Sequence, residues 1–128
     1  WFKQNNSDVE SIHTYFKKFK TPKADKPIIL SEFGGYALSI EGHLFSPGKE
    51  YGYRSFSNGQ EFEKALTELY TKEIIPAVQK GLCASILTQL SDVEDETNGL
   101  LTYDRAVLKV STEPFKKISS ALAEQIKK

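Results

Sequence analysis

Two short apolar segments of the chain predict strands that are buried on both faces. The segment KPIILS (26–31) has a proline near its start and is followed by Gly34 and Gly35, which end the strand abruptly. The segment LCASIL (82–87) has the same apolar character. Runs this short do not suit a helix and are typical of strands in a parallel sheet, which helices cover on both faces. The pattern therefore predicts two buried parallel strands.

After each of these segments, apolar residues recur with the spacing of an amphipathic helix. Ser57 and Gln60 form a capping-box pattern that opens the first helix, and Pro76 falls in its last turns, before Gly81. The segment TEP (112–114) is expected to cap and begin the second helix. The predicted core-facing positions are Phe62, Leu66, Leu69, Tyr70 and Ile74 in the first helix, and Phe115, Ile118, Leu122 and Ile126 in the second.

The first 26 residues allow two interpretations. Ser7 and Glu10 have the spacing of a helix cap for residues 8–20, whereas residues 9–13 alternate in the manner of a strand. From residue 26 onward the order is strand, helix, strand, helix. Long loops (36–57 and 88–111) occur only after strands. Loops as long as the first are generally functional or disordered, and its aromatic residues argue against disorder. This order predicts an α/β protein with a parallel sheet.

Composition narrows the class of protein. The chain has 128 residues, the size of one domain, and its 17 basic and 17 acidic residues give a net charge of zero. This balance argues against nucleic-acid or membrane-surface partners, which need excess positive charge, and no apolar stretch is long enough for a membrane span. One cysteine excludes an intrachain disulfide framework. The chain has no Met and begins Trp1-Phe2, so we expect it to be part of a longer polypeptide.

Glu32 is the sharpest candidate for chemistry. It directly follows an apolar strand, which places its carboxylate at the carboxyl edge of the sheet, where ligands bind in barrels and open sheets alike. Gly34 and Gly35 leave space for a ligand beside it. A glutamate that simply accepts hydrogen bonds at the end of a strand fits the same pattern, so spacing alone leaves both interpretations open.

The remaining candidates are weaker. Cys83 lies in an apolar strand and is expected to be a small buried group, and His43 has no evident partner in the sequence. An acidic cluster is expected to face water, and it lacks the ligand spacing of a calcium loop. No glycine-rich phosphate loop follows either strand, which argues against a flavodoxin-like fold, and we expect no cofactor. The acidic residues are Asp92, Glu94, Asp95 and Glu96.

Three segments in order resemble glycoside hydrolase family 2, the family of β-galactosidases, β-glucuronidases and β-mannosidases. The segment KPIILSEFGG (26–35) resembles the family's nucleophile strand and carries most of the weight. The segment NGLLTYDR (98–105), with Lys109 behind it, is similar to the closing segment after the last barrel strand. The pattern of Asp8, Val9, Ser11, His13 and Tyr15 is similar to the sixth-strand segment.

The resemblance implies a fold. Residues 1–128 would form the C-terminal portion of a (β/α)8 TIM barrel, about strands six to eight with their helices, and the ambiguous start would be a strand. A whole barrel needs about 250 residues. The first five barrel strands and the family's β-sandwich domains would therefore lie outside this chain, so we expect self-association or association with that missing part.

The resemblance also implies a reaction. Family members are retaining glycosidases, which use two carboxyl groups about 5–5.5 Å apart. Glu32 matches the nucleophile, Tyr15 the tyrosine that hydrogen-bonds it, and His13 a position that lines the sugar pocket, although a purely structural histidine fits equally well. The acid/base glutamate belongs to strand four of the family. The parent protein would thus hydrolyse β-glycosides, whereas this chain alone would be nearly inactive.

Two departures from the family pattern concern the substrate. Thr88, with Gln89 beside it, stands where many members place a tryptophan that stacks on the sugar. Glu96 and Asn98 stand where glucuronidases carry an asparagine and a lysine that bind a uronate, and a glutamate there would repel a carboxylate. A neutral sugar such as a β-galactoside is therefore favoured. The competing hypothesis is a non-catalytic carbohydrate-binding or interaction module derived from the barrel.

Overall fold

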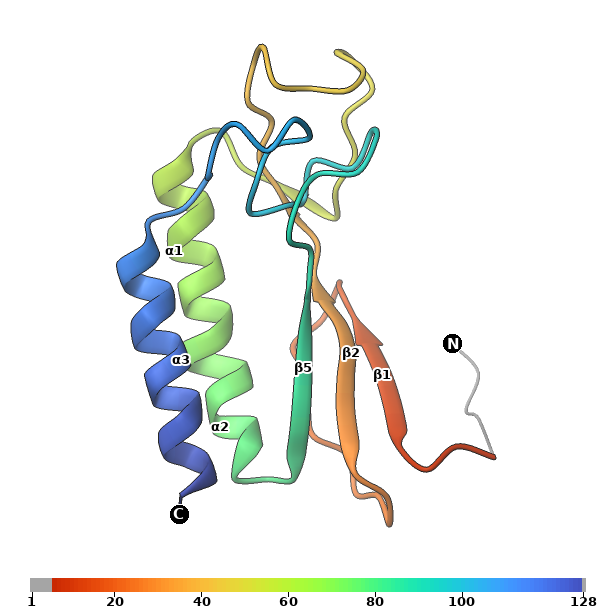
Figure 1. Ribbon diagram of the computed structural model, residues 1–128. Coiled ribbons are helices and arrows are strands. Elements are labelled where there is room, and N and C mark those ends of the chain that lie inside the picture. Colours follow the sequence, from red (N-terminus) through yellow and green to blue (C-terminus); the bar gives the residue numbers. More distant parts are fainter. Residues whose placement is uncertain (1–5, 128) are drawn as a thin grey trace.

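The computed structural model describes residues 6–127, so Trp1 and Phe2 lie outside the described part. Its centre is a three-stranded parallel sheet in the order β1-β2-β5 (Figure 1), with β1 at Glu10–Thr14, β2 at Ile28–Gly34 and β5 at Leu82–Thr88. The predicted α/β class with a parallel sheet is confirmed. Residues 10–14 form a strand, so the alternative of a helix over residues 8–20 is wrong. Among the described residues the sheet is open and no barrel closes.

All helices pack on one face of this sheet (Figure 1). The first helical segment comprises α1 (Gly59–Leu69), a π-helical turn η1 (Tyr70–Ile74) and α2 (Ile75–Val78), and α3 (Thr112–Ile126) runs beside it. Pro76 cannot donate a backbone hydrogen bond, and its ring would clash with the carbonyl four residues earlier. The wider turn directly before it accommodates both effects. No helix in the described residues is long and apolar enough to cross a bilayer.

The core consists of two packed clusters. The buried side chains of β2 form the centre of the first, and α1 supplies two members of the second, which packs against loop residues. Leu30 and Ile74 are fully buried, at 0% exposure, where β2 meets the π-helical turn. The first cluster comprises Ile28, Leu30, Phe33, Ile74, Ala77 and Leu82, and the second comprises Leu38, Phe62, Leu66 and Val110.

The expectation that both strands are buried on two faces is wrong for β5. Cys83 is exposed rather than buried, and Ile86 is 57% exposed. β5 is the last strand of the described sheet, and the helices cover one face only, so Cys83, Ala84 and Ile86 are left exposed. In β2 the side chains of Ile28, Leu30 and Phe33 are buried, whereas Ile29 is only partly buried, so this strand too has one well-covered face.

The helix boundaries differ slightly from the predicted ones. The cap of α1 is Asn58, whose side chain accepts a hydrogen bond from the Glu61 amide at 2.9 Å, and not Ser57. Ser111, rather than the TEP segment itself, precedes α3. Ile126 is 80% exposed because it lies in the last turn of α3, so its predicted core position is wrong.

The long loop after β2 contains a short parallel strand pair that the sequence pattern did not predict. β3 (Tyr36–Ala37) pairs with β4 (Arg54–Ser55). The pair draws the two ends of the loop together, so that aromatic residues near residue 53 lie beside the end of β2. The loop is therefore ordered by backbone pairing rather than by its side chains alone.

Leu30→Ala tests the burial pattern of the sheet. Removing a fully buried leucine leaves a cavity, so we expect the free energy of unfolding to fall by about 2–5 kcal/mol. Ile86→Ala is the matched control, because this side chain is more than half exposed, and its substitution is expected to cost under about 1 kcal/mol. Urea denaturation of both variants measures the difference, and equal losses would contradict the one-sided core.

Candidate active site

The Glu32 carboxylate lies at the carboxyl end of β2 and is held by residues of β1 and its exit. The register pairs His13 with Glu32 across β1 and β2. The Tyr15 hydroxyl donates a hydrogen bond to Glu32 Oε2 at 2.6 Å, and His13 Nδ1 lies 3.2 Å from the same oxygen. The Glu32 side chain is 43% exposed. A carboxylate fixed on one oxygen and open to solvent can meet a ligand from the loop side of the sheet.

Tyr15 joins all three strands of the sheet. Its only hydroxyl proton goes to Glu32, so in the 3.0 Å contact with Thr88 Oγ1 at the end of β5 the threonine is the donor. Burial, followed by the hydrogen bond to Glu32, raises the pKa of Tyr15 above its ordinary value of 10.0. The phenol therefore stays protonated at neutral pH and remains a donor to Glu32. The structure thus brings His13, Tyr15, Glu32 and Thr88 together.

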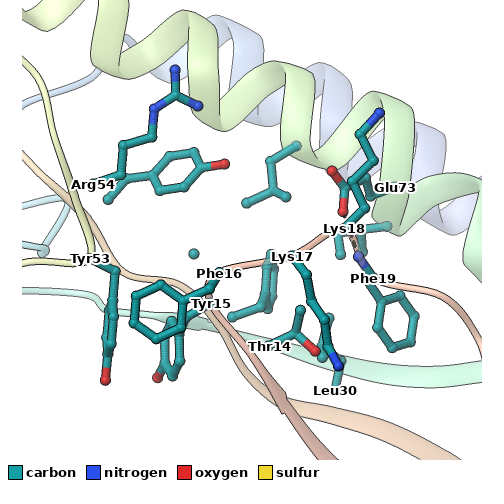
Figure 2. A pocket seen from close by; sticks show the side chains of 15 residues that line it. Thr14, Tyr15, Phe16, Lys17, Lys18, Phe19, Leu30, Tyr53, Arg54 and Glu73 are labelled. Atoms are coloured by element: carbon teal, nitrogen blue, oxygen red, sulfur yellow. Dashed lines mark hydrogen bonds between the residues drawn. The ribbon is translucent and has the colours of Figure 1, made fainter.

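A second tyrosine, which the sequence pattern did not single out, supports Tyr15. The rings of Tyr15 and Tyr53 stack with their centroids 4.0 Å apart and their planes 13° apart. Figure 2 shows the two rings side by side with both hydroxyls pointing the same way. Gly35 makes this stack possible, because a Cβ atom there would lie 2.3 Å from Tyr53 Cδ2 and 3.0 Å from Tyr15 Cδ1. The only sequence signal for this stack was the Gly34-Gly35 pair.

A pocket of about 400 Å³ lies beside these rings (Figure 2). Its lining includes Tyr15, Phe16 and Tyr53, the buried side chain of Leu30, and Glu73, which accepts a hydrogen bond from the Phe19 amide at 2.8 Å. Glu32 is not among the residues that line it. Tyr15 therefore belongs to both features: its ring lines the pocket, and its hydroxyl donates a hydrogen bond to the Glu32 carboxylate.

Gln89 belongs to a polar cluster next to this site. Its side-chain amide donates to Glu96 Oε2 at 3.0 Å and to Asn98 Oδ1 at 2.6 Å. Burial raises the pKa of Tyr53, and the Tyr51 side chain and the charges of Glu96 and Glu32 raise it further. The peptide bond between Thr88 and Gln89 is cis.

The prediction that the acidic cluster faces water is wrong for Asp92. This residue is 3% exposed and forms a buried ion pair with Lys109, with Nζ 2.6 Å from Oδ1. Desolvation lowers the pKa of Lys109, and the bond to Asp92 opposes that effect. Lys109 Nζ also donates to the Thr97 carbonyl at 3.0 Å, and the Gly99 amide donates to Asp92 at 2.8 Å. The pair therefore fixes the backbone that carries Glu96 and Asn98.

The acidic cluster forms no metal site in the described part of the chain, where no group of three or more potential ligands gathers. His43, which had no evident partner in the sequence, lies with Nδ1 2.7 Å from Asp104 Oδ2. Hydrogen bonds from Thr102, from His43 and from the Ala106 amide lower the pKa of Asp104 from 3.8 to about 2. This contact joins the long loop after β2 to the closing segment near residue 104.

Gly35→Ala tests the ring stack. The new methyl group would overlap Tyr53 and Tyr15 in a backbone conformation with φ of +62°, so we expect a loss of about 2–4 kcal/mol in the free energy of unfolding and a weaker near-ultraviolet tyrosine dichroism. Gly48→Ala is the control, since its φ is +84° but no atom lies within 4 Å, and it is expected to cost about 1–2 kcal/mol. Equal effects on stability and dichroism would contradict the stack.

Lys109→Met tests the buried ion pair. It leaves the Asp92 carboxylate buried and unpaired, so we expect a loss of about 3–5 kcal/mol in the free energy of unfolding by urea denaturation. Adding Asp92→Asn removes the uncompensated charge and is expected to restore part of that loss. A double variant that is less stable than the Lys109→Met variant would show that the pair does not act as a unit.

Comparisons with known proteins add no relative. No protein-family model matches the chain, and no curated protein matches it significantly. The resemblance to glycoside hydrolase family 2 therefore rests on the three ordered segments. The contacts around Glu32 provide a separate, geometric basis for a functional assignment.

Proposed function

We propose that this chain is the nucleophile-bearing portion of a retaining β-glycosidase. The observation that carries the proposal is the 2.6 Å hydrogen bond from Tyr15 to Glu32 at the carboxyl edge of a parallel sheet. The bond leaves Glu32 Oε1 outside the Tyr15 contact while it restrains the rotation of the carboxylate. A half-exposed, oriented carboxylate at this edge is suited to attack a carbon atom from the solvent side.

The proposed reaction has two steps. A Glu32 oxygen attacks the anomeric carbon of the sugar, the bond from that carbon to the leaving oxygen breaks, and the leaving oxygen takes a proton from a carboxylic acid. Water, deprotonated by the same acid/base group, then attacks the anomeric carbon and releases Glu32. Tyr15 holds the carboxylate during attack and donates to it again when the ester breaks. We assign the acid/base group to the part of the barrel outside this chain.

The proposed architecture follows from the same assignment. The sheet β1-β2-β5 corresponds to strands six to eight of a (β/α)8 barrel, with the earlier strands beside β1. Cys83 and Ile86 are exposed on β5, and their exposure supports further contacts at the β5 end of the sheet. Association with the remaining strands of the polypeptide, or with a second copy, would cover them.

The proposed substrate is a neutral sugar, such as a β-galactoside. Glu96, whose carboxylate accepts hydrogen bonds from Gln89 and Asn98 in the segment after β5, would repel a uronate. Carboxylate and carboxamide groups are suited to hydrogen bonds with sugar hydroxyls. Gln89 and Thr88, at the end of β5, would form the floor of this sugar site.

A non-catalytic carbohydrate-binding module is the second candidate. The observation that favours it is the engagement of Glu96 with Gln89 and Asn98, because this hydrogen bonding makes Glu96 unsuited to serve as a proton donor beside Glu32. In this alternative the same polar groups bind sugar but no bond is cleaved. The two candidates differ only in whether Glu32 becomes covalently linked to the sugar.

Covalent labelling tests the proposal. Incubating the full polypeptide with a fluorinated galactoside inactivator is expected to esterify Glu32, as mapped by peptide mass spectrometry. Glu32→Gln is expected to abolish labelling and to reduce hydrolysis by on the order of a thousandfold or more. The control Glu94→Gln removes an exposed acid from the loop after β5 and is expected to change neither result. A label on another residue, or sugar binding without any label, would contradict the nucleophile assignment.

A further inference from the structure

The Tyr15 hydroxyl lies between two oxygen atoms that belong to different strands. Glu32 Oε2, on β2, is 2.6 Å away, and Thr88 Oγ1, at the end of β5, is 3.0 Å away. An ionised carboxylate can only accept hydrogen bonds, so the single proton of the phenol goes to Glu32. The phenol oxygen then accepts the proton of the Thr88 hydroxyl. The two hydrogen bonds therefore run in one direction, from Thr88 to Tyr15 and from Tyr15 to Glu32.

The Thr88 hydroxyl is held in place by the pairing of β2 with β5. Thr88 pairs with Gly34 in the register of these strands, and its carbonyl accepts a hydrogen bond from the Gly35 amide at 3.0 Å. A β-branched side chain has few rotamers, so a fixed backbone also restricts the position of its hydroxyl. Within the described part of the chain, Tyr15 is the only hydrogen-bond partner of this hydroxyl. The threonine proton is therefore directed to the Tyr15 oxygen.

A hydrogen bond donated to a phenol oxygen makes the phenol a stronger donor. Hydrogen bonds in a chain polarise one another, so donation from Thr88 strengthens the bond from Tyr15 to Glu32. Burial and the bond to Glu32 raise the pKa of Tyr15, whereas the bond from Thr88 opposes both effects. The Tyr15 ring, stacked on Tyr53 with the centroids 4.0 Å apart, keeps its hydroxyl between the two partners. Thr88 can thus influence Glu32 without touching it.

We infer that Thr88 is a positioning residue, which acts through Tyr15 to strengthen and orient the hydrogen bond that holds Glu32. The inference rests on the proposed function, because it concerns the carboxylate that is proposed to attack the sugar. The resemblance does not imply this role, since many family members carry a tryptophan where this chain has Thr88. In the first step Thr88 helps to keep Glu32 aimed. In the second step it strengthens the donor that faces the negative charge returning to Glu32 when the ester breaks.

The test measures hydrolysis of nitrophenyl β-galactoside by the full polypeptide that contains this chain. Thr88→Val keeps the shape of the side chain and removes the donor. We expect kcat to fall about fivefold, the effect of one lost hydrogen bond, while KM changes by under about twofold. Thr88→Ser keeps a hydroxyl and is expected to restore most of kcat. Thr14→Val is the matched control, because it removes a threonine hydroxyl at the end of β1 that forms no hydrogen bond within the described residues; kcat is expected to stay unchanged.

Tyr15→Phe separates action through Tyr15 from direct contact with the sugar. Without the Tyr15 hydroxyl, Thr88 has no path to Glu32, so adding Thr88→Val to Tyr15→Phe is expected to lower kcat no further. An equal loss in both backgrounds, or a higher KM with unchanged kcat, would show that Thr88 contacts the substrate and overturns the inference. A Thr88→Ser variant that is as slow as Thr88→Val overturns it as well.

Two further measurements separate this inference from an effect on the fold and from the proposed function. Urea denaturation is expected to give the same midpoint for Thr88→Val and Thr88→Ser, and if Thr88→Val fails to fold, Thr88→Ala replaces it in both backgrounds. Covalent labelling of Glu32 together with an unchanged kcat in Thr88→Val overturns the inference and leaves the proposed function standing. A polypeptide without substitutions that is neither labelled at Glu32 nor active contradicts the proposed function itself, and the inference with it.

Discussion

The hydrogen bond between Tyr15 and Glu32 is the interaction on which the candidate site depends. It joins the exit of β1 to the end of β2, and it forms only because the parallel register brings His13 and Glu32 side by side. Thr88 extends the contact to β5, so the Tyr15 hydroxyl links the ends of all three strands. A shift in the pairing of any of these strands would separate the donor from the carboxylate.

The loops around this site are ordered by close backbone approach and by a buried charge pair. Gly35 lets Tyr53 lie flat on Tyr15. Gly99 lets the closing segment approach the backbone of residues 91 and 92 closely, because a Cβ atom on residue 99 would lie 2.2 Å from the Asp92 nitrogen. Asp92 and Lys109 then satisfy the polar groups that this approach buries. The polar side chains at residues 89, 96 and 98 are therefore displayed from a rigid backbone, as a preorganised binding site requires.

The asymmetry of the sheet connects the fold to the proposed function. Helices cover one face, and the exposed apolar side chains of β5 lie in the part of the sheet that has no further strand beside it in the described residues. The edge that carries Glu32, by contrast, is ordered by contacts within the chain. Under the proposed function, the nucleophile and its positioning residues would be organised within this chain, and the rest of the barrel would supply the acid/base group and the cover for the sheet.

The sequence by itself determined the α/β class, the positions of β2, β5 and the helical stripes, and the candidacy of Glu32, because apolar periodicity and glycine placement are local properties of the chain. The resemblance to glycoside hydrolase family 2 added two expectations, a strand at the ambiguous start of the chain and a hydrogen bond from Tyr15 to Glu32. Only the tertiary structure decided that Asp92 is buried, that His43 contacts Asp104 and that Tyr53 stacks on Tyr15. These contacts join residues far apart in the sequence, and their geometry depends on loop conformations that no local pattern specifies.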